Sequence, residues 1–180
     1  MRMRTIQKRR RRENKTDYLN RLKLLKSEKP RLVFRKTNKY LIGQYILSEE
    51  AQDKINFGTT SKTLLKYGWP ESFKGSLKSI PASYLTGYMI AKKILKDKLE
   101  KPIMDLGMLR TLHKTKIFAF LKGAIDAGLD IPCPEEAFPE EERIQGKDMK
   151  EDFTKTFNEI KSKLDKQPQG VPSSKKEVKA

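Results

Sequence analysis

Three β-rich segments separated by short polar stretches are the feature of this sequence that most constrains its fold. The segments are 31–35, 40–46 and 54–60. Their branched and aromatic residues favour strands, and segments this close in the chain pair as sequential antiparallel neighbours. Asn38 in the first turn suits the positive φ that tight hairpins need. Polar and basic residues recur between the apolar ones, so we expect one face of the sheet to lie outside the core.

Two amphipathic helices with a short strand between them complete the predicted domain. Pro81 suits the first turn of a helix that runs to about Leu99, and Gly128 ends a second helix over about 116–127. The segment 102–107 between them predicts a short buried strand. The apolar stripe of the first helix is Tyr84, Tyr88, Ala91, Leu95 and Leu99. This order indicates an α/β fold with helices packed on a mixed, mostly antiparallel sheet.

The two ends of the chain add a basic arm, a last helix and a tail. Residues 1–15 form an arm without an apolar face, which should be disordered alone and order on a polyanion. The α/β domain then covers 16–146, and a C-terminal helix covers 147–165. Residues 166–180 are a polar tail that should be disordered. The apolar stripe of the last helix must be buried in this domain or on a neighbour.

The segment 16–28 predicts a short helix with two different faces. Thr16 or Asp17 can cap its start, and Pro30 stops it. The face that should pack on the domain holds Tyr18, Leu19, Leu22 and Leu25. The face that should offer cations outward holds Arg21, Lys23 and Lys26. Further along, a stretch rich in Pro, Glu and Gly at 131–146 is expected to be irregular.

Positive charge is concentrated at the beginning of the chain. The 180 residues include 40 Lys and Arg against 23 Asp and Glu, a net charge of +17. Residues 1–47 hold 16 of the basic and 3 of the acidic residues, whereas 48–180 hold 24 and 20. Such a field attracts polyanions, with nucleic acid the leading partner class and an anionic membrane surface the rival. We expect no membrane partner, because no apolar run approaches the roughly 20 residues of a span and no secretory signal follows the basic start.

The side chains that usually carry catalysis or bind metals are scarce. His113 and Cys133 are the only histidine and cysteine, too few for a four-ligand zinc site or a disulfide. A Cys–His nucleophile pair would need these two residues from separate irregular segments. The segment Gly58–Lys62 has the composition of a phosphate loop but lacks the second glycine before lysine. We therefore expect no enzyme activity, no cofactor, no metal and no small-molecule substrate.

Residue types suited to RNA gather in the arm and the first hairpin. Arginine grips phosphates or stacks on bases, while asparagine and glutamine bond base edges or the 2′-hydroxyl. The hairpin candidates are Arg31, Arg35, Lys36, Asn38, Lys39 and Gln44. Tyr40 and Tyr45 can either stack on unpaired bases or be half-buried strand residues. The loop 110–116 adds a second cationic point, where His113 is either an RNA contact or an ordinary loop residue.

These segments resemble a known family. The motif RLVFRKTNK at 31–39, followed by Gln44, resembles the opening strands of the eighteenth universal large-subunit ribosomal protein in its archaeal and eukaryotic form. Further matches are KYGW at 66–69, PASYLTG at 81–87, LKGAIDAGL at 121–129 and the segment 139–146. The similarity runs in order from about residue 8 to about 149. The chain is shorter than the eukaryotic members, so it is similar to archaeal ones, and the tail after Lys166 matches no family pattern.

The resemblance implies a structural constituent of the large subunit in the cytoplasmic ribosome. Such a protein binds 5S ribosomal RNA and attaches it to the large-subunit ribosomal RNA in the central protuberance. The fifth universal large-subunit ribosomal protein would be its close neighbour, with other large-subunit proteins around it. Carried over by position, the implied RNA-facing residues are Arg9, Arg10, Arg11, Arg12, Arg31, Arg35, Thr37, Asn38, Lys39, Gln44, Thr111, His113, Lys114 and Lys116.

Two other functions stay open on the sequence. A basic regulatory or assembly factor acting off the ribosome would share the charge pattern and would bind duplex DNA as tightly as 5S RNA. A phosphoryl-transfer enzyme would use the Gly58–Lys62 segment, and its nucleotide hydrolysis would vanish in Lys62→Ala.

Overall fold

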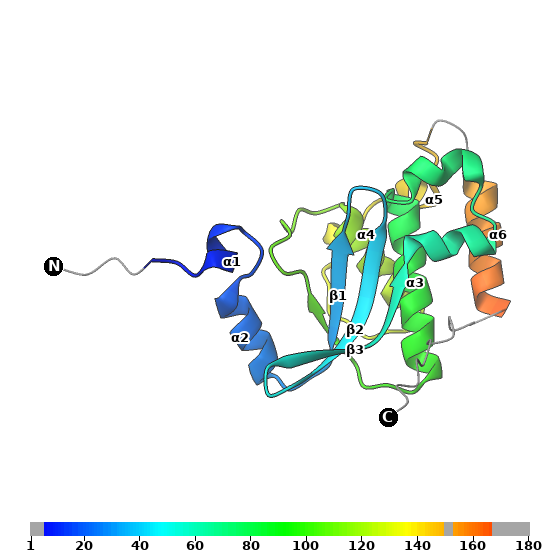
Figure 1. The fold of residues 1–180 in the computed structure, drawn as a ribbon. Coiled ribbons are helices and arrows are strands. Elements are labelled where there is room, and N and C mark those ends of the chain that lie inside the picture. Colours follow the sequence, from blue (N-terminus) through cyan, green and yellow to red (C-terminus); the bar gives the residue numbers. More distant parts are fainter. Residues whose placement is uncertain (1–5, 150–152, 167–180) are drawn as a thin grey trace, which may run out of the picture.

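The computed structural model describes residues 6–149 and 153–166, which form a four-stranded sheet with helices on both sides (Figure 1). The strands are β1 (Arg31–Lys36), β2 (Leu41–Glu49), β3 (Gln52–Thr60) and β4 (Ile103–Asp105). The α-helices are α1 (Arg9–Arg12), α2 (Tyr18–Lys26), α3 (Ile80–Lys96), α4 (Lys116–Asp126), α5 (Glu141–Gln145) and α6 (Thr154–Lys166). The 3₁₀ helices are η1 (Ser61–Tyr67), η2 (Glu71–Ser76) and η3 (Glu135–Ala137).

The sheet has the order β3-β2-β1-β4. Strands β1 and β2 pair antiparallel from Arg31 opposite Ile46 to Lys36 opposite Leu41, and β2 pairs antiparallel with β3. Only β4 is parallel to its neighbour in this sheet, with Asp105 opposite Val33. The prediction of an α/β fold on a mixed, mostly antiparallel sheet is confirmed.

The two hairpins use different turn chemistry. In the first, the Thr37 hydroxyl donates to the carbonyl oxygen of Tyr40 at 2.6 Å and accepts the Tyr40 N–H at 3.0 Å. Asn38 does not adopt a positive φ, so that prediction is wrong; the threonine side chain closes the turn instead. The positive φ values lie in the second hairpin, at Glu50 (46°) and Ala51 (66°), as a two-residue turn of right-handed twist requires.

Helices α3 and α4 cover one face of the sheet and cross each other closely. Leu32, Phe34, Leu41 and Tyr45 of the sheet pack under them in one apolar cluster. A Cβ atom at Gly87 of α3 would lie 2.0 Å from the carbonyl oxygen of Phe120, and one at Gly123 of α4 would lie 2.1 Å from that of Tyr84. The backbones of the two helices can therefore meet only because both positions are glycine.

Helix α3 is buried on more sides than its predicted stripe. Ser79 caps its start by accepting the Ala82 N–H, and Pro81 lies in the first turn. Ile90 and Ile94 are buried against the sheet side, whereas Leu95, predicted to be apolar core, is 43% exposed. The prediction for Leu95 is wrong because two clusters, one at the sheet and one on the side of α6, bury other faces of the helix.

Helix α6 belongs to the same domain. Phe157, Ile160 and Leu164 are buried in a second apolar cluster that also holds Trp69. The helix begins at Thr154, later than the sequence suggests, although Phe153 just before it is also buried. The stretch 131–146, expected to be irregular, contains η3 and α5, because Ala137 and Ile144 are buried in it. The predicted tail lies outside the described residues from position 167 onward.

Helix α2 lies on the opposite side of the sheet from α3 and α4 (Figure 1). Asp17 caps it by accepting the N–H groups of Leu19 and Asn20. The predicted orientation is wrong. Leu19 is 65% exposed and Leu22 is 51% exposed, while Arg21 reaches inward to Asp53. A carboxylate partner on the sheet therefore decides which face of this helix turns inward.

We expect Gly87→Ala to lower the free energy of unfolding by ~3 kcal/mol, because the added methyl group meets backbone rather than a flexible side chain. Urea titration followed by circular dichroism measures this. The matched control is Gly75→Ala in η2, where an added Cβ atom meets nothing within 4 Å. Equal stabilities for the two variants would contradict the close helix crossing.

Candidate nucleic-acid interface

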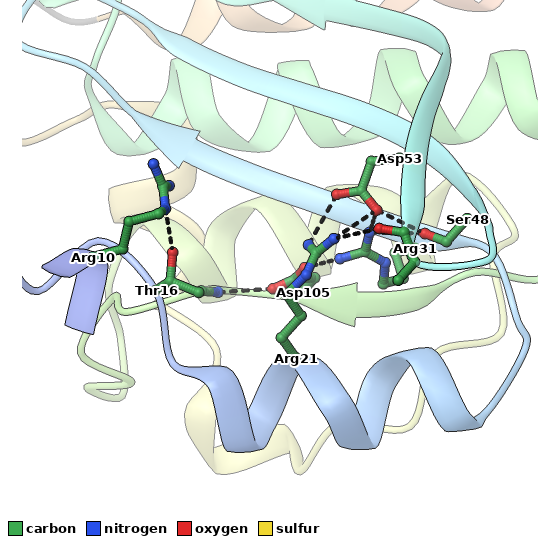
Figure 2. Close-up of polar contacts among 9 residues, drawn as sticks. Arg10, Thr16, Arg21, Arg31, Ser48, Asp53 and Asp105 are labelled. Atoms are coloured by element: carbon green, nitrogen blue, oxygen red, sulfur yellow. Dashed lines mark hydrogen bonds and ion pairs between the residues drawn. The ribbon is translucent and has the colours of Figure 1, made fainter. Parts of the chain in front are cut away.

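A buried arginine organises the face of the sheet that α2 covers (Figure 2). Arg31 is 2% exposed. Its guanidinium donates to Asp105 at 2.7 Å, to the Ser48 hydroxyl at 2.9 Å, and to Asp53. Since Arg31 itself lies on β1, these contacts join it to β2, to β3 and to the end of β4.

Arg21 connects α2 to the same network. It donates to the two carboxylate oxygens of Asp53 at 2.9 and 3.1 Å and to the Ala51 carbonyl oxygen at 3.2 Å. This is the bidentate geometry that arginine forms with carboxylates, and it is the strongest form of such a pair. Helix α2 is thus attached by an ion pair, and it has no buried residue of its own.

The ion pairs hold the pKa of Asp53 at about 2, below its ordinary value of 3.8. Burial acts in the opposite direction and is the largest single influence, but hydrogen bonds from Arg21, Ser48 and Arg31 together outweigh it. Asp53 is therefore ionised at all physiological pH values and holds both arginines.

Arg31 was predicted to face RNA, and the structure contradicts this. Its side chain is enclosed between Asp53 and Asp105, so it neutralises internal carboxylates and is not available to a phosphate. Sequence reasoning missed the role because the two aspartates lie 22 and 74 positions away. Only the strand register brings them together.

A groove of about 540 Å³ lies between the N-terminal segment and the sheet face beside this network. Cations exceed carboxylates in its lining, which holds Arg10, Lys15, Arg21, Arg35 and Lys36 against Asp17, Asp53 and Asp105. Asn14, Asn20 and Thr37 add polar groups. The arm, α2 and the first hairpin, which are separate in the sequence, thus meet around one polar cavity that a chain of phosphates fits by charge.

The cations of the arm are held only loosely. Residues 9–12 form one helical turn, α1, where the sequence suggested disorder; Arg9, Arg10 and Arg12 are exposed and Arg11 is half-buried. Arg10 donates to the Thr16 hydroxyl at 2.9 Å. Arg9 lies 3.8 Å from Glu13, and Arg11 lies 3.7 Å from Asp17. Exposed pairs of this kind contribute little free energy, so the arginines can exchange these partners for phosphates.

The tip of the first hairpin carries exposed cations without acidic partners. Arg35, Lys36 and Lys39 are exposed, and none has a carboxylate within ion-pair distance in the part of the chain that the structure describes. Asn38 is exposed beside them, while Thr37 uses its hydroxyl in the turn.

Three polar or aromatic candidates on β2 and beside it are placed differently. Gln44 is half-buried, with its side chain over Gly58. Tyr45 is buried and stacks on Phe57, which removes it as a base-stacking candidate. Tyr40 is half-buried, with the Lys62 ammonium 4.4 Å from its ring centre. Gly58, Thr59 and Thr60 are residues of strand β3 paired with β2, so the segment Gly58–Lys62 does not form a phosphate loop.

Only some residues of the second predicted RNA-facing segment, Thr111 to Lys116, are exposed and unpaired. Thr111 and His113 are exposed, and His113 lies edge-on to Phe118. Lys114 pairs with Glu140 at 3.0 Å. Lys116 is half-buried, and burial lowers its pKa, with Lys36 and Lys78 adding repulsion. Lys36, Lys78 and Lys116 have no carboxylate within ion-pair distance among the described residues, and cations gathered in this way favour an anionic partner.

A family model described as "Ribosomal large subunit proteins 60S L5, and 50S L18" matches residues 2–102. The chain belongs to this family. It is 46% identical to the large ribosomal subunit protein uL18 of Korarchaeum cryptofilum (strain OPF8) over 138 residues, which are 77% of this chain and 69% of that protein. It is 44% identical to uL18 of Methanoculleus marisnigri (strain ATCC 35101 / DSM 1498 / JR1) over 138 residues, 77% of each chain.

Membership in the L5/L18 family confirms the resemblance read from the sequence and settles the class of function. The protein is a structural component of the large ribosomal subunit and not an enzyme, and it works in the cytoplasmic ribosome with ribosomal RNA and other large-subunit proteins as partners. None of the described helices is long and apolar enough to cross a membrane. Within the described ranges, no three His, Cys, Asp or Glu side chains are grouped to hold a metal ion.

We expect Asp53→Asn to lower the free energy of unfolding at pH 7 by about 2 kcal/mol, because it leaves Arg31 buried with one carboxylate fewer. The pKa of Asp53 is lower in the folded state than its ordinary 3.8, so its contribution is complete above about pH 4. It is lost as the pH falls through about 2, and the difference between wild type and variant should shrink over that interval.

Urea titrations at pH 7, 4 and 2.5 measure this dependence. Asp130→Asn is the control, because Asp130 pairs with Lys101 on the surface with both side chains more than 70% exposed. It should leave the urea midpoint unchanged at pH 7. If the difference in free energy of unfolding between Asp53→Asn and wild type stays constant down to pH 2.5, the stabilisation does not come from ionised Asp53 paired with Arg21 and Arg31.

Proposed function

We propose that this protein binds 5S ribosomal RNA and attaches it to the large-subunit ribosomal RNA in the central protuberance. The observation that carries the proposal is the groove of about 540 Å³, at which the basic arm, α2 and the first hairpin converge. Arg35 and Lys36 line it without acidic partners among the described residues, and the arginines of α1 stand beside it in weak pairs. The family resemblance names 5S RNA as the polyanion.

The groove is suited to folded RNA with unpaired nucleotides. Its cations come from the arm, α2 and the first hairpin, and its polar groups include Asn14 and Asn20, a residue type that bonds bases or the 2′-hydroxyl. The RNA contacts in this proposal are Arg9, Arg10, Arg11, Arg12, Arg35, Lys36, Thr37, Asn38, Lys39, Gln44, Thr111, His113, Lys114 and Lys116. Arg31 supports the groove from inside. The fifth universal large-subunit ribosomal protein would be the neighbour on the assembled particle.

The proposal assigns a role to each of three segments of the chain. Residues 1–15 act as the RNA-binding arm and 16–146 as the folded RNA-binding domain. The segment 147–165 supports that domain through the packing of α6. The tail 166–180 has no role assigned to it.

We expect Arg35→Ala and Asn38→Ala each to weaken 5S RNA binding about tenfold, or ~1.4 kcal/mol, without unfolding the domain. Arg35→Ala should also reduce the slope of log affinity against log salt by about one, since it removes one phosphate contact. Filter binding to 5S RNA measures both effects. Lys155→Ala is the matched control, because Lys155 is an exposed lysine on α6. Equal affinity for 5S RNA and for duplex DNA of the same length would instead favour a regulatory factor.

Removing residues 1–12 should lower the affinity for 5S RNA and flatten its dependence on salt, because the four arginines of α1 leave with the arm. Asp17 and Arg21 remain, so the cap and the attachment of α2 are kept. The measurement is the same filter-binding titration from low to high salt. An unchanged slope would show that the arm does not neutralise RNA phosphates.

A further inference from the structure

A second cavity, of about 510 Å³, adjoins the groove at the segment Met108–Leu109. Phe34 and Lys36 line both spaces, as do the two residues of that segment, so the cavity continues the groove toward the start of α4. Its size is within the range of about 300–1,000 Å³ that is usual for pockets that hold small organic groups.

The cavity combines an apolar wall with a cationic rim. Its apolar residues are Phe34, Ile80, Met108, Leu109, Leu112 and Ile117. Its cations are Lys36, Arg110, Lys114, Lys116 and Arg143. No acidic residue is among those that line it, whereas Asp17, Asp53 and Asp105 all line the groove.

Most of this positive charge is not neutralised within the protein. Lys114 pairs with Glu140 at 3.0 Å, and Arg143 lies 3.4 Å from Asp148. Lys36, Arg110 and Lys116 have no carboxylate within ion-pair distance in residues 6–149 and 153–166. The half-buried position of Lys116 makes its charge costly unless an anion joins it.

The apolar wall of the cavity is also partly exposed to solvent. Leu112 lines it although 59% of that residue is exposed to solvent. An occupant that is apolar on its faces and anionic at its edge would complete both sides at once. A nucleotide has this character, since its base offers flat apolar faces and its phosphate carries the charge.

We propose that this cavity binds one unstacked nucleotide of ribosomal RNA, with the base against the apolar wall around Leu112 and the adjoining phosphates on Lys36, Arg110 and Lys116. This deepens the proposed function, since it rests on RNA lying in the neighbouring groove. An acidic protein segment is the other occupant that the charge would admit, and the experiment distinguishes it.

Base-specific chemical probing of the complex with 5S RNA tests the site. Dimethyl sulfate and a carbodiimide together modify the Watson–Crick edges of all four bases. We expect one single-stranded nucleotide to be protected by the wild-type protein and to regain the reactivity of free RNA with Leu112→Asp, which places a carboxylate among the cations. The conservative variant Leu112→Met should keep the protection seen with the wild-type protein. Leu95→Asp, the same change at an exposed leucine of α3, should leave it intact.

The affinity of Leu112→Asp should fall about tenfold, the usual scale for losing one base contact. If wild type and Leu112→Asp give the same probing profile and the same affinity on 5S RNA, that RNA does not supply the nucleotide. If wild type does not bind 5S RNA at all, the proposed function fails, and the second arm of the experiment still tests the cavity.

The second arm uses photo-crosslinking in assembled large subunits. The protein carries p-benzoylphenylalanine in place of Leu112 and is irradiated after assembly. A cross-link to a nucleotide of 5S or large-subunit ribosomal RNA supports the proposal and identifies which RNA supplies the base. A cross-link mainly to another ribosomal protein, or none to RNA, overturns it.

Discussion

One guanidinium connects the strands of the sheet on the face that α2 covers. Arg31 of β1 contacts Ser48 of β2, Asp53 at the start of β3 and Asp105 at the end of β4. Through Asp53 it shares a partner with Arg21 of α2. A buried ion pair of this kind costs desolvation and adds little net stability, so its value lies in fixing one arrangement. The arrangement it fixes is the position of α2 over the sheet, and with it the walls of the groove.

The two faces of the sheet are therefore held by different interactions. On one face, α3 and α4 meet backbone to backbone at Gly87 and Gly123, and their apolar clusters supply the burial on which stability depends. On the other face, charge replaces apolar contact, and α2 is left with exposed leucines such as Leu19. Apolar burial is thus concentrated on the α3 and α4 side, while the α2 side holds the ion pairs and the groove lined by Arg35 and Lys36.

Local sequence patterns predicted the strands and helices. Ion pairs between residues distant in the chain determined which side chains face the core and which line the groove. The turn-separated strands, the helix opened by Pro81 and the apolar stripe of the last helix follow from periodicity and end signals in the sequence. The burial of Arg31 and the inward turn of Arg21 do not, because both depend on Asp53, which is distant in the chain. The cavity beside Lys116 is likewise formed by residues of four separate segments. RNA binding could be inferred from composition and resemblance, whereas the shape of the site required the register of the sheet.

The distance along the chain between Arg31 and Asp105 has a consequence for biosynthesis. The 74 positions that separate them mean that the network is incomplete until β4 has left the exit tunnel. The basic arm is made first, and Asp53, the partner of Arg21, follows 32 positions after that arginine. The groove is also lined by Met108 and Leu109, so it cannot be complete before more than half of the polypeptide exists. A truncated nascent chain therefore carries the charge but not the groove. The groove is therefore completed late in synthesis, and only a chain that has folded through β4 presents it.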